Sequence, residues 1–281
     1  MKKQLIIMPL LIIVPACAGG GDDYTERMAG EHDGDEPVSN VSSENLQGAN
    51  ISTENVEYTE TDGETISGYY AEPENASEDI PAIIVIHEWW GLNENIRTMT
   101  DQLAAEGYKA LAVDLYSGEV TESSEEAQQL MQQAMEDPET AIENLDAAID
   151  YLKGERSADR LGVIGWCFGG AWSLNISLAS ADEIDATVIY YGHLETDPAA
   201  ISDLNHPVLG IFGEEDEGIP VEDAHEFEAA LQEIGVEHEI HIYEGADHAF
   251  ANPSGNNYNA EAAEDAWEKT TSFLDRTLKG E

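Results

Sequence analysis

Basic residues are scarce in this chain of 281 residues. It has 11 Lys and Arg against 59 Asp and Glu, which gives a formal net charge of -48. A surface this negative repels the phosphate backbone, so nucleic-acid binding is excluded as a function class. The acidic residues are spread along the whole chain rather than gathered in one patch. We therefore expect a halophilic adaptation, in which salt screens the self-repulsion of an acidic surface.

The apolar run at the N-terminus is too short to span a bilayer. It covers about ten residues, Leu5–Val14, and follows Lys2 and Lys3, as in a secretory signal. It ends in V-P-A-C-A-G-G, which resembles a bacterial lipobox and implies cleavage before Cys17 with lipid attached to that cysteine. We expect residues 1–16 to be a signal peptide and the protein to be an exported cell-envelope lipoprotein, facing the periplasm or the exterior. The alternative is an ordinary secretory signal cut nearby.

Cysteine is nearly absent, since the chain contains only Cys17 and Cys167. If Cys17 is lipidated, Cys167 has no partner for a disulfide. An unpaired cysteine in an exported protein is a candidate reactive thiol. A thiol oxidoreductase is disfavoured, because no second cysteine would remain to resolve a mixed disulfide.

The chain divides by composition into a tether and one folded domain. Residues 17–50 are rich in Gly, Asp, Glu, Ser and Asn with few apolar side chains, which predicts a disordered acidic tether. Residues 51–281 contain no second boundary and no internal repeat. We expect them to form a single domain.

Strands and helices alternate along that domain. The apolar run A-I-I-V-I at 82–86 is typical of a strand buried on both faces. Further strands are predicted at 56–59, 65–71, 109–113, 161–164, 186–191, 208–212 and 239–243. Helices are predicted at 95–106, 121–135, 138–152, 171–179, 221–234 and 259–278. This order predicts the α/β class, with a mostly parallel central sheet flanked by helices.

The sequence G-W-C-F-G at 165–169 is a nucleophile-elbow pattern, G-x-[nucleophile]-x-G. A strand turns sharply into a helix there, and glycine leaves room for the backbone on both sides of a strained central residue. The start of the helix favours negative charge and would bias Cys167 toward the thiolate. The alternative is a glycine-rich turn around a buried cysteine.

A nucleophilic thiol needs a base, and the base needs an orienting acid. His248 follows the predicted strand 239–243, and Asp216 follows the predicted strand 208–212. Strand ends are where such partners stand in α/β-hydrolases. Rival carboxylates lie close to these positions: Glu214, Glu215, Glu217 and Asp247.

The remaining histidines predict no metal site. His238 and His241 are three residues apart on a predicted strand, so they point to opposite faces. The others show no ligand spacing, and we expect surface or structural roles for His32, His193, His206 and His225. Nothing in the sequence implies an organic cofactor.

Six motifs, all in the family's order, resemble the dienelactone hydrolase (carboxymethylenebutenolidase) family of the α/β-hydrolase fold. They are H-E-W-W-G-L-N at 87–93, D-L-Y at 114–116, G-W-C-F-G-G at 165–170, Y-Y-G at 190–192, G-E-E-D at 213–216 and D-H-A-F at 247–250. The resemblance covers about residues 81–250 and implies the triad Cys167, Asp216 and His248. It also implies that Glu88 contacts the thiol and helps it ionise.

The same resemblance implies an oxyanion hole made by the backbone N–H groups of Trp89 and Phe168. The predicted position of Phe168 near a helix start independently favours such a role. Large aromatic side chains are expected to line an apolar substrate pocket. The candidates, each with core packing as its alternative, are Trp89, Trp90, Trp166 and Tyr191.

One departure from the family pattern bears on the substrate. Family members that act on dienelactone hold its carboxylate with arginines, one of them four residues after the catalytic histidine. Asn252 stands at that position here, and no Lys or Arg occurs between Asp114 and Leu152. A carboxylate would lack its bidentate partner. We therefore expect a neutral ester or lactone rather than dienelactone.

The sequence thus predicts a hydrolase that cleaves a carboxylic ester or lactone through a Cys-His-Asp triad and a thioester intermediate. Its expected partners are a small-molecule substrate and, through the lipid anchor, a membrane. The alternative is a non-catalytic, surface-anchored binding lipoprotein that keeps the hydrolase fold. The retained nucleophile, acid and histidine favour the enzyme.

Overall fold

The computed structural model describes residues 21–32, 49–61, 63–77 and 79–280. The expected signal peptide, Cys17 and most of the expected tether lie outside these residues. Among the helices that are described, none combines the length and the apolar character that a membrane crossing requires.

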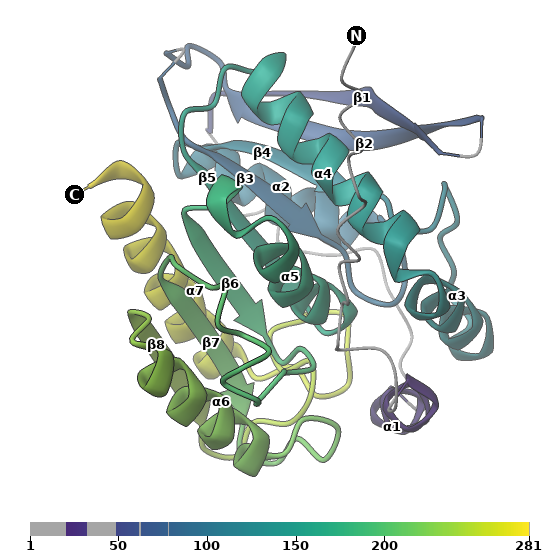
Figure 1. Cartoon of the computed structure of the whole chain (residues 1–281). Coiled ribbons are helices and arrows are strands. Elements are labelled where there is room, and N and C mark those ends of the chain that lie inside the picture. The colour runs from purple at the N-terminus through teal and green to yellow at the C-terminus, as the bar shows by residue number, and fades with distance from the viewer. Residues whose placement is uncertain (1–20, 33–48, 62, 78, 281) are drawn as a thin grey trace, which may run out of the picture.

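An eight-stranded sheet forms the centre of the domain, in the order β1-β2-β4-β3-β5-β6-β7-β8 (Figure 1). The strands are β1 (Ile51–Thr61), β2 (Glu64–Pro73), β3 (Ala82–Ile86), β4 (Lys109–Val113), β5 (Leu161–Trp166), β6 (Ala186–Tyr190), β7 (Val208–Gly213) and β8 (His238–Tyr243). β1 and β2 pair antiparallel, as do β2 and β4, and every other pair is parallel. The predicted α/β-hydrolase architecture is confirmed.

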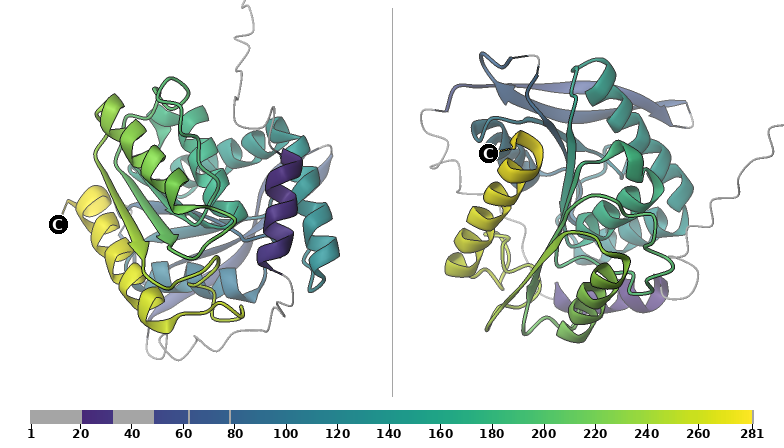
Figure 2. Two further views of the ribbon diagram at one scale, coloured as in Figure 1. Left: turned by 90° about the horizontal axis from the view of Figure 1, so that it is seen from below. Right: turned by 60° about the vertical axis from the view of Figure 1, so that its left-hand side comes forward.

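Helices cover both faces of the sheet. They are α2 (Glu94–Ala105), α3 (Ser124–Glu136), α4 (Pro138–Gly154), α5 (Phe168–Ala179), α6 (Val221–Ile234) and α7 (Ala260–Leu274), with a last turn at Asp275–Lys279 and a short 3-10 turn at Ala181–Glu183. α2 and α7 lie on one face, and α4, α5 and α6 lie on the other (Figure 2). This double cover explains why β3 and β5 are buried along their whole length.

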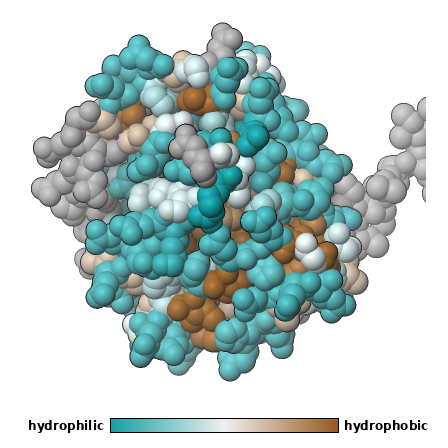
Figure 3. All heavy atoms as spheres, turned by 90° about the vertical axis from the view of Figure 1, so that its left-hand side faces the viewer, coloured by the Kyte–Doolittle hydropathy of each residue, from teal (hydrophilic) through white to brown (hydrophobic). Residues whose placement is uncertain are grey.

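The outer surface is mostly polar. Viewed from the side that carries the C-terminus, the molecule is largely hydrophilic with a few small apolar patches (Figure 3). Of the large apolar side chains in the described ranges, Val120 and Tyr258 are the exposed ones. The apolar residues have therefore gone into the core around the sheet.

One helix replaces part of the expected tether. Gly21–Glu31 form α1, which packs beside α3 (Figure 1 and the left view of Figure 2). Tyr24 and Met28 are four residues apart, so they share a helix face, and both are buried. The prediction of disorder is wrong for this stretch, because its few apolar side chains are placed to cover one site of the domain.

Close backbone packing at the elbow leaves no room for a side chain at either flanking glycine. A methyl group on Gly165 would lie 2.1 Å from the carbonyl oxygen of Gly169, and one on Gly169 would lie 2.3 Å from that of Ile86. These two contacts join β3, β5 and the first turn of α5. They hold the start of α5 against the end of the sheet.

We predict that Gly169→Ala lowers the free energy of unfolding by about 2 kcal/mol, because the methyl group must push backbone apart. The matched control is Gly154→Ala at the end of α4, where an added methyl meets nothing within 4 Å. Urea denaturation of both variants measures the difference. Equal stabilities would contradict the packing described at the elbow.

Candidate active site

Cys167 is the single residue between β5 and α5, and its backbone is strained. Its φ is 55° and its ψ is -117°, a conformation that side chains rarely adopt. Its N–H donates to the carbonyl oxygen of Tyr190 at 3.0 Å, which holds the turn against β6. The strained turn predicted from the glycine spacing is confirmed.

His248 and Asp216 are brought together by two loops at the carboxyl edge of the sheet. The Nδ1 of His248 lies 2.8 Å from Oδ2 of Asp216, and both side chains are fully buried. The other oxygen of Asp216 accepts from the N–H of Ile219 at 2.7 Å, which orients the carboxylate. The imidazole therefore keeps its Nε2 for chemistry, as a base oriented by an acid requires.

The rival acids do not bond to the His248 ring. Glu214, Glu215 and Glu217 are exposed. Asp247 accepts the backbone N–H of His248 at 2.7 Å and leaves the ring to Asp216. Geometry thus selects Asp216 as the partner of the imidazole.

The charges of this group favour an ionised thiol. Burial raises the pKa of Cys167, but interactions with His248 and His32 lower it by more, to about 6. Burial lowers the pKa of His248, whereas Asp216 and Cys167 raise it well above its ordinary value. The result at neutral pH is a thiolate–imidazolium pair whose two members titrate together.

The loop after β3 supplies the next neighbours. Glu88 is buried, and its Oε2 accepts a hydrogen bond from Nδ2 of Asn252 at 2.6 Å. Trp89 and Trp90 follow it, both buried, with ring centroids 4.8 Å apart. Phe168 opens α5, so its N–H is among the helical amides that have no acceptor within the helix.

The aromatic pocket is only partly as expected. Tyr191 lies against His248, with ring centroids 5.1 Å apart. Trp166 packs on Tyr190 and lines a separate cavity beside α2 and α7, whose lining contains none of the three residues Cys167, Asp216 and His248. Side chains alternate along β5, so Trp166 lies on the other side of the sheet from α5. The prediction that Trp166 lines the substrate pocket at Cys167 is therefore wrong.

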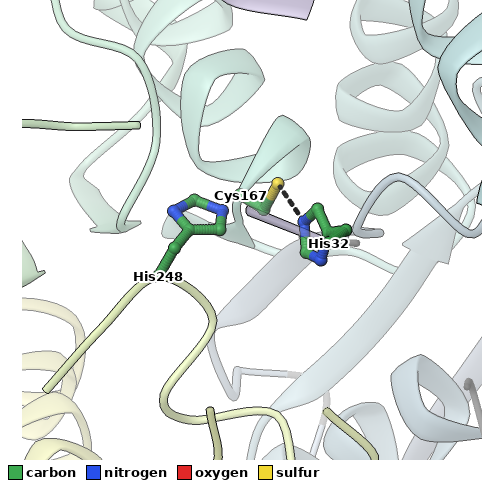
Figure 4. A group of neighbouring side chains, drawn as sticks. All are labelled: His32, Cys167 and His248. Carbon is green, nitrogen blue, oxygen red and sulfur yellow. Dashed lines mark hydrogen bonds between the residues drawn. The ribbon is translucent and has the colours of Figure 1, made fainter. Parts of the chain in front are cut away.

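A histidine that precedes the predicted domain, residues 51–281, also lies next to the thiol of Cys167. His32, directly after α1, places its Nε2 3.6 Å from Sγ of Cys167 (Figure 4). Its ring stacks on Trp89 with centroids 4.3 Å apart. The Sδ of Met28 lies 3.9 Å from the same sulfur. Of the surface or structural role expected for His32, the surface position is wrong, because the side chain is buried against the thiol. The spacing of Tyr24, Met28 and His32, four residues apart each time, was the signal that could have revealed it.

Two other histidines, His206 and His87, have hydrogen-bond partners away from the thiol. The Nε2 of His206 bonds Oγ1 of Thr187 at 2.8 Å, within a buried network on β6. His87 accepts the N–H of Leu115 at Nε2 and therefore donates from Nδ1 to the carbonyl oxygen of Glu88. Burial lowers the pKa of His87, in keeping with a neutral structural ring.

Three tyrosine hydroxyls are buried around the thiol without a hydrogen-bond partner among the described residues. They belong to Tyr24, Tyr116 and Tyr191. Each of these side chains is close enough to Cys167 for the thiolate to raise its pKa, although burial is the larger cause. The site therefore offers neutral hydrogen-bond donors inside an aromatic surround.

Comparison with known proteins bears on the family of the chain. The sequence profile of the dienelactone hydrolase family matches residues 66–278. A protein named "Putative carboxymethylenebutenolidase" from Saccharolobus solfataricus is 33% identical, covering 79% of this chain and 98% of its own. Another of that name from Synechocystis is 34% identical over 76% of this chain and 93% of its own.

A solved structure is also similar. The "Putative Dienelactone Hydrolase" from Klebsiella pneumoniae superposes with a TM-score of 0.71 at 29% identity, covering 80% of this chain and 99% of its own. The family match begins at residue 66. α1 and His32 therefore lie outside the part of the chain that resembles the family.

We predict that the thiolate absorbance of Cys167, taken as wild type minus Cys167→Ala, titrates with a midpoint of about 6 rather than the ordinary value of about 8.5. The thiolate is present above this pH and is lost as the pH falls through it. His248→Ala should move the midpoint upward, because it removes the main group that lowers this pKa. His225→Ala, an exposed histidine on α6, is the control. A wild-type midpoint above about 8 would contradict the thiolate–imidazolium pair.

Proposed function

Because the chain belongs to the dienelactone hydrolase family, we propose that it hydrolyses a neutral carboxylic ester or lactone through a thioester intermediate on Cys167. The observation that supports this best is the buried His248–Asp216 pair next to an ionised thiol at the start of α5. This arrangement supplies a nucleophile, a base and an orienting acid in one place.

The first half of the reaction forms the thioester. The Cys167 thiolate attacks the carbonyl carbon, and the developing oxyanion is bound by the N–H groups of Trp89 and Phe168. When the C–O bond breaks, the imidazolium of His248 gives its proton to the leaving alkoxide. Asp216 keeps the ring oriented and stabilises its charged form.

The second half of the reaction hydrolyses the thioester and releases the carboxylic acid product. Neutral His248 takes a proton from water, and the resulting hydroxide attacks the thioester carbonyl. The C–S bond then breaks and returns Cys167 as the thiolate. Esters and lactones suit this chemistry better than amides, because a thiolate leaves more readily than an amine.

Glu88 is the further acidic residue that the resemblance assigns to the catalytic group. Its carboxylate is held by the amide of Asn252, a neutral partner at the position where dienelactone-cleaving relatives would carry an arginine. The resemblance implies that this glutamate helps the thiol to ionise. In this chain His248 and His32 supply the interactions that lower the pKa of Cys167.

The surroundings favour an uncharged substrate. The buried hydroxyls of Tyr24, Tyr116 and Tyr191 can donate to a neutral oxygen. A substrate carboxylate would enter a chain of net charge -48 with no arginine at position 252. The hydroxyls can donate to either kind of substrate, so the net charge and the missing arginine are the observations that support a neutral ester or lactone over dienelactone.

We predict that the full chain hydrolyses p-nitrophenyl acetate and that Cys167→Ala lowers kcat/KM by at least about 1,000-fold, because the covalent route is lost. Asp216→Asn, which keeps the shape of the acid, should lower it by a smaller factor. The assay is run at low and at molar salt, and a halophilic protein is expected to be more active in molar salt. Hydrolysis that persists in Cys167→Ala would contradict the mechanism. A wild type that is folded but inactive would favour the alternative of a non-catalytic binding lipoprotein.

Substrate charge provides a separate test. We predict that a neutral aryl ester is hydrolysed with a kcat/KM at least about 10-fold above that of a matched ester bearing a carboxylate, because the charged hydrogen bond is missing. Asn252→Arg should narrow this ratio, whereas Asn252→Gln, which adds length without charge, should not. A wild-type preference for the anionic ester would contradict the proposal.

A further inference from the structure

Three metal-ligating side chains from distant parts of the chain meet at the nucleophile. His32, Cys167 and His248 each offer one ligand atom, these atoms lie within 4.8 Å of one another, and all three side chains are buried (Figure 4). We propose that they form a zinc(II) site that fastens α1 over Cys167 and keeps the active site closed. The inhibitory effect rests on the proposed function, whereas the binding of the ion does not.

The geometry suits a tetrahedral ion. Zinc–sulfur bonds of about 2.3 Å and zinc–nitrogen bonds of about 2.0–2.1 Å place the sulfur and nitrogen ligands about 3.6 Å apart. Sγ of Cys167 and Nε2 of His32 are separated by 3.6 Å. The remaining separations are at most 4.8 Å, so His248 reaches the ion by a movement of roughly 1 Å.

The chemistry of the donors selects the metal. One thiolate and two imidazoles form a borderline-soft set that zinc prefers, while calcium and magnesium prefer oxygen ligands. The Nδ1 of His248 is bonded to Asp216, and its Nε2 has no partner among the described residues. A carboxylate that orients a histidine ligand in this way is a common arrangement at zinc sites.

The charge around the site attracts a cation. A cleft of about 1300 Å³ lies between α1 and the loop after β7, beside Asp216. Its lining includes the carboxylates Glu26, Glu31, Glu214, Glu215, Glu217 and Asp247. Arg27 also lines the cleft, but the carboxylates outnumber it. The net negative charge raises the local concentration of cations, which favours delivery of a divalent cation to the buried ligands.

A bound ion would stop catalysis by occupying the reacting atoms. The metal would take the lone pair of the Cys167 thiolate, which is the nucleophile. It would also take Nε2 of His248, which is the base, and would release the proton bound there to solvent. Because His32 precedes the first residue matched by the family, this control belongs to the N-terminal extension of this chain.

Cobalt(II) bound at such a site can be detected by its absorbance spectrum. A thiolate that coordinates cobalt(II) gives a sulfur-to-cobalt charge-transfer band. The full chain, stripped of metal, is titrated with cobalt(II) and then with zinc(II). We expect one equivalent to bind with this band and zinc to displace it. His32→Phe keeps an aromatic ring on Trp89 but has no ligand atom, and we expect it to weaken binding by at least about 10-fold. The exposed histidine variant His225→Ala should bind as wild type does.

The outcomes separate this proposal from the proposed function. The absence of a charge-transfer band in the wild type, or equal affinity in His32→Phe, overturns the zinc site even if the protein hydrolyses esters. Cobalt binding that is at least about 10-fold weaker in His32→Phe supports the site even in a protein without esterase activity. Where activity is present, one equivalent of zinc should lower it in the wild type and far less in His32→Phe, and equal inhibition of both would overturn the closure by α1.

Discussion

The backbone contact between Gly165 and Gly169 is the constraint on which the site depends. Because neither residue has a side chain, α5 begins directly at the end of β5, and Cys167 is held at a positive φ with its sulfur at the carboxyl edge of the sheet. The loops that carry His248 and Asp216 leave parallel strands at this same edge. A looser turn would lower the strain but would remove the sulfur from its partners.

The site needs positive charge next to the thiolate, although the chain as a whole is strongly negative. With a formal net charge of -48, an ionised thiol needs local positive charge, and imidazoles supply it because no arginine takes this role. Arg156 lies over the buried ring of Tyr70, Arg276 pairs with Glu239, and Arg27 on α1 donates to the carbonyl oxygen of Gly218. Burial of His248 next to Asp216 protects the pair from screening by salt.

α1 adds a second layer to a site that the family fold already completes. Tyr24, Met28 and His32 lie on one side of the helix and its last turn, and they meet His193, the thiol and Trp89 in order along it. The segment is short and polar overall, so its helix depends on these contacts rather than on its own propensity. Access to the nucleophile and the order of α1 are therefore coupled.

The sequence by itself determined the alternation of strands and helices, the elbow at Cys167 and the placement of Asp216 and His248 after later strands. These features follow local patterns, and parallel strands bring their carboxyl ends together whatever the loops contain. Only the tertiary structure decided that Asp216 rather than Asp247 meets the ring, that Trp166 faces away, and that His32 reaches the thiol. The Asp216–His248 and His32–Cys167 contacts join segments 32 and 135 residues apart, so they depend on how the loops and α1 pack. The side of the sheet on which Trp166 lies depends on which helices cover each face.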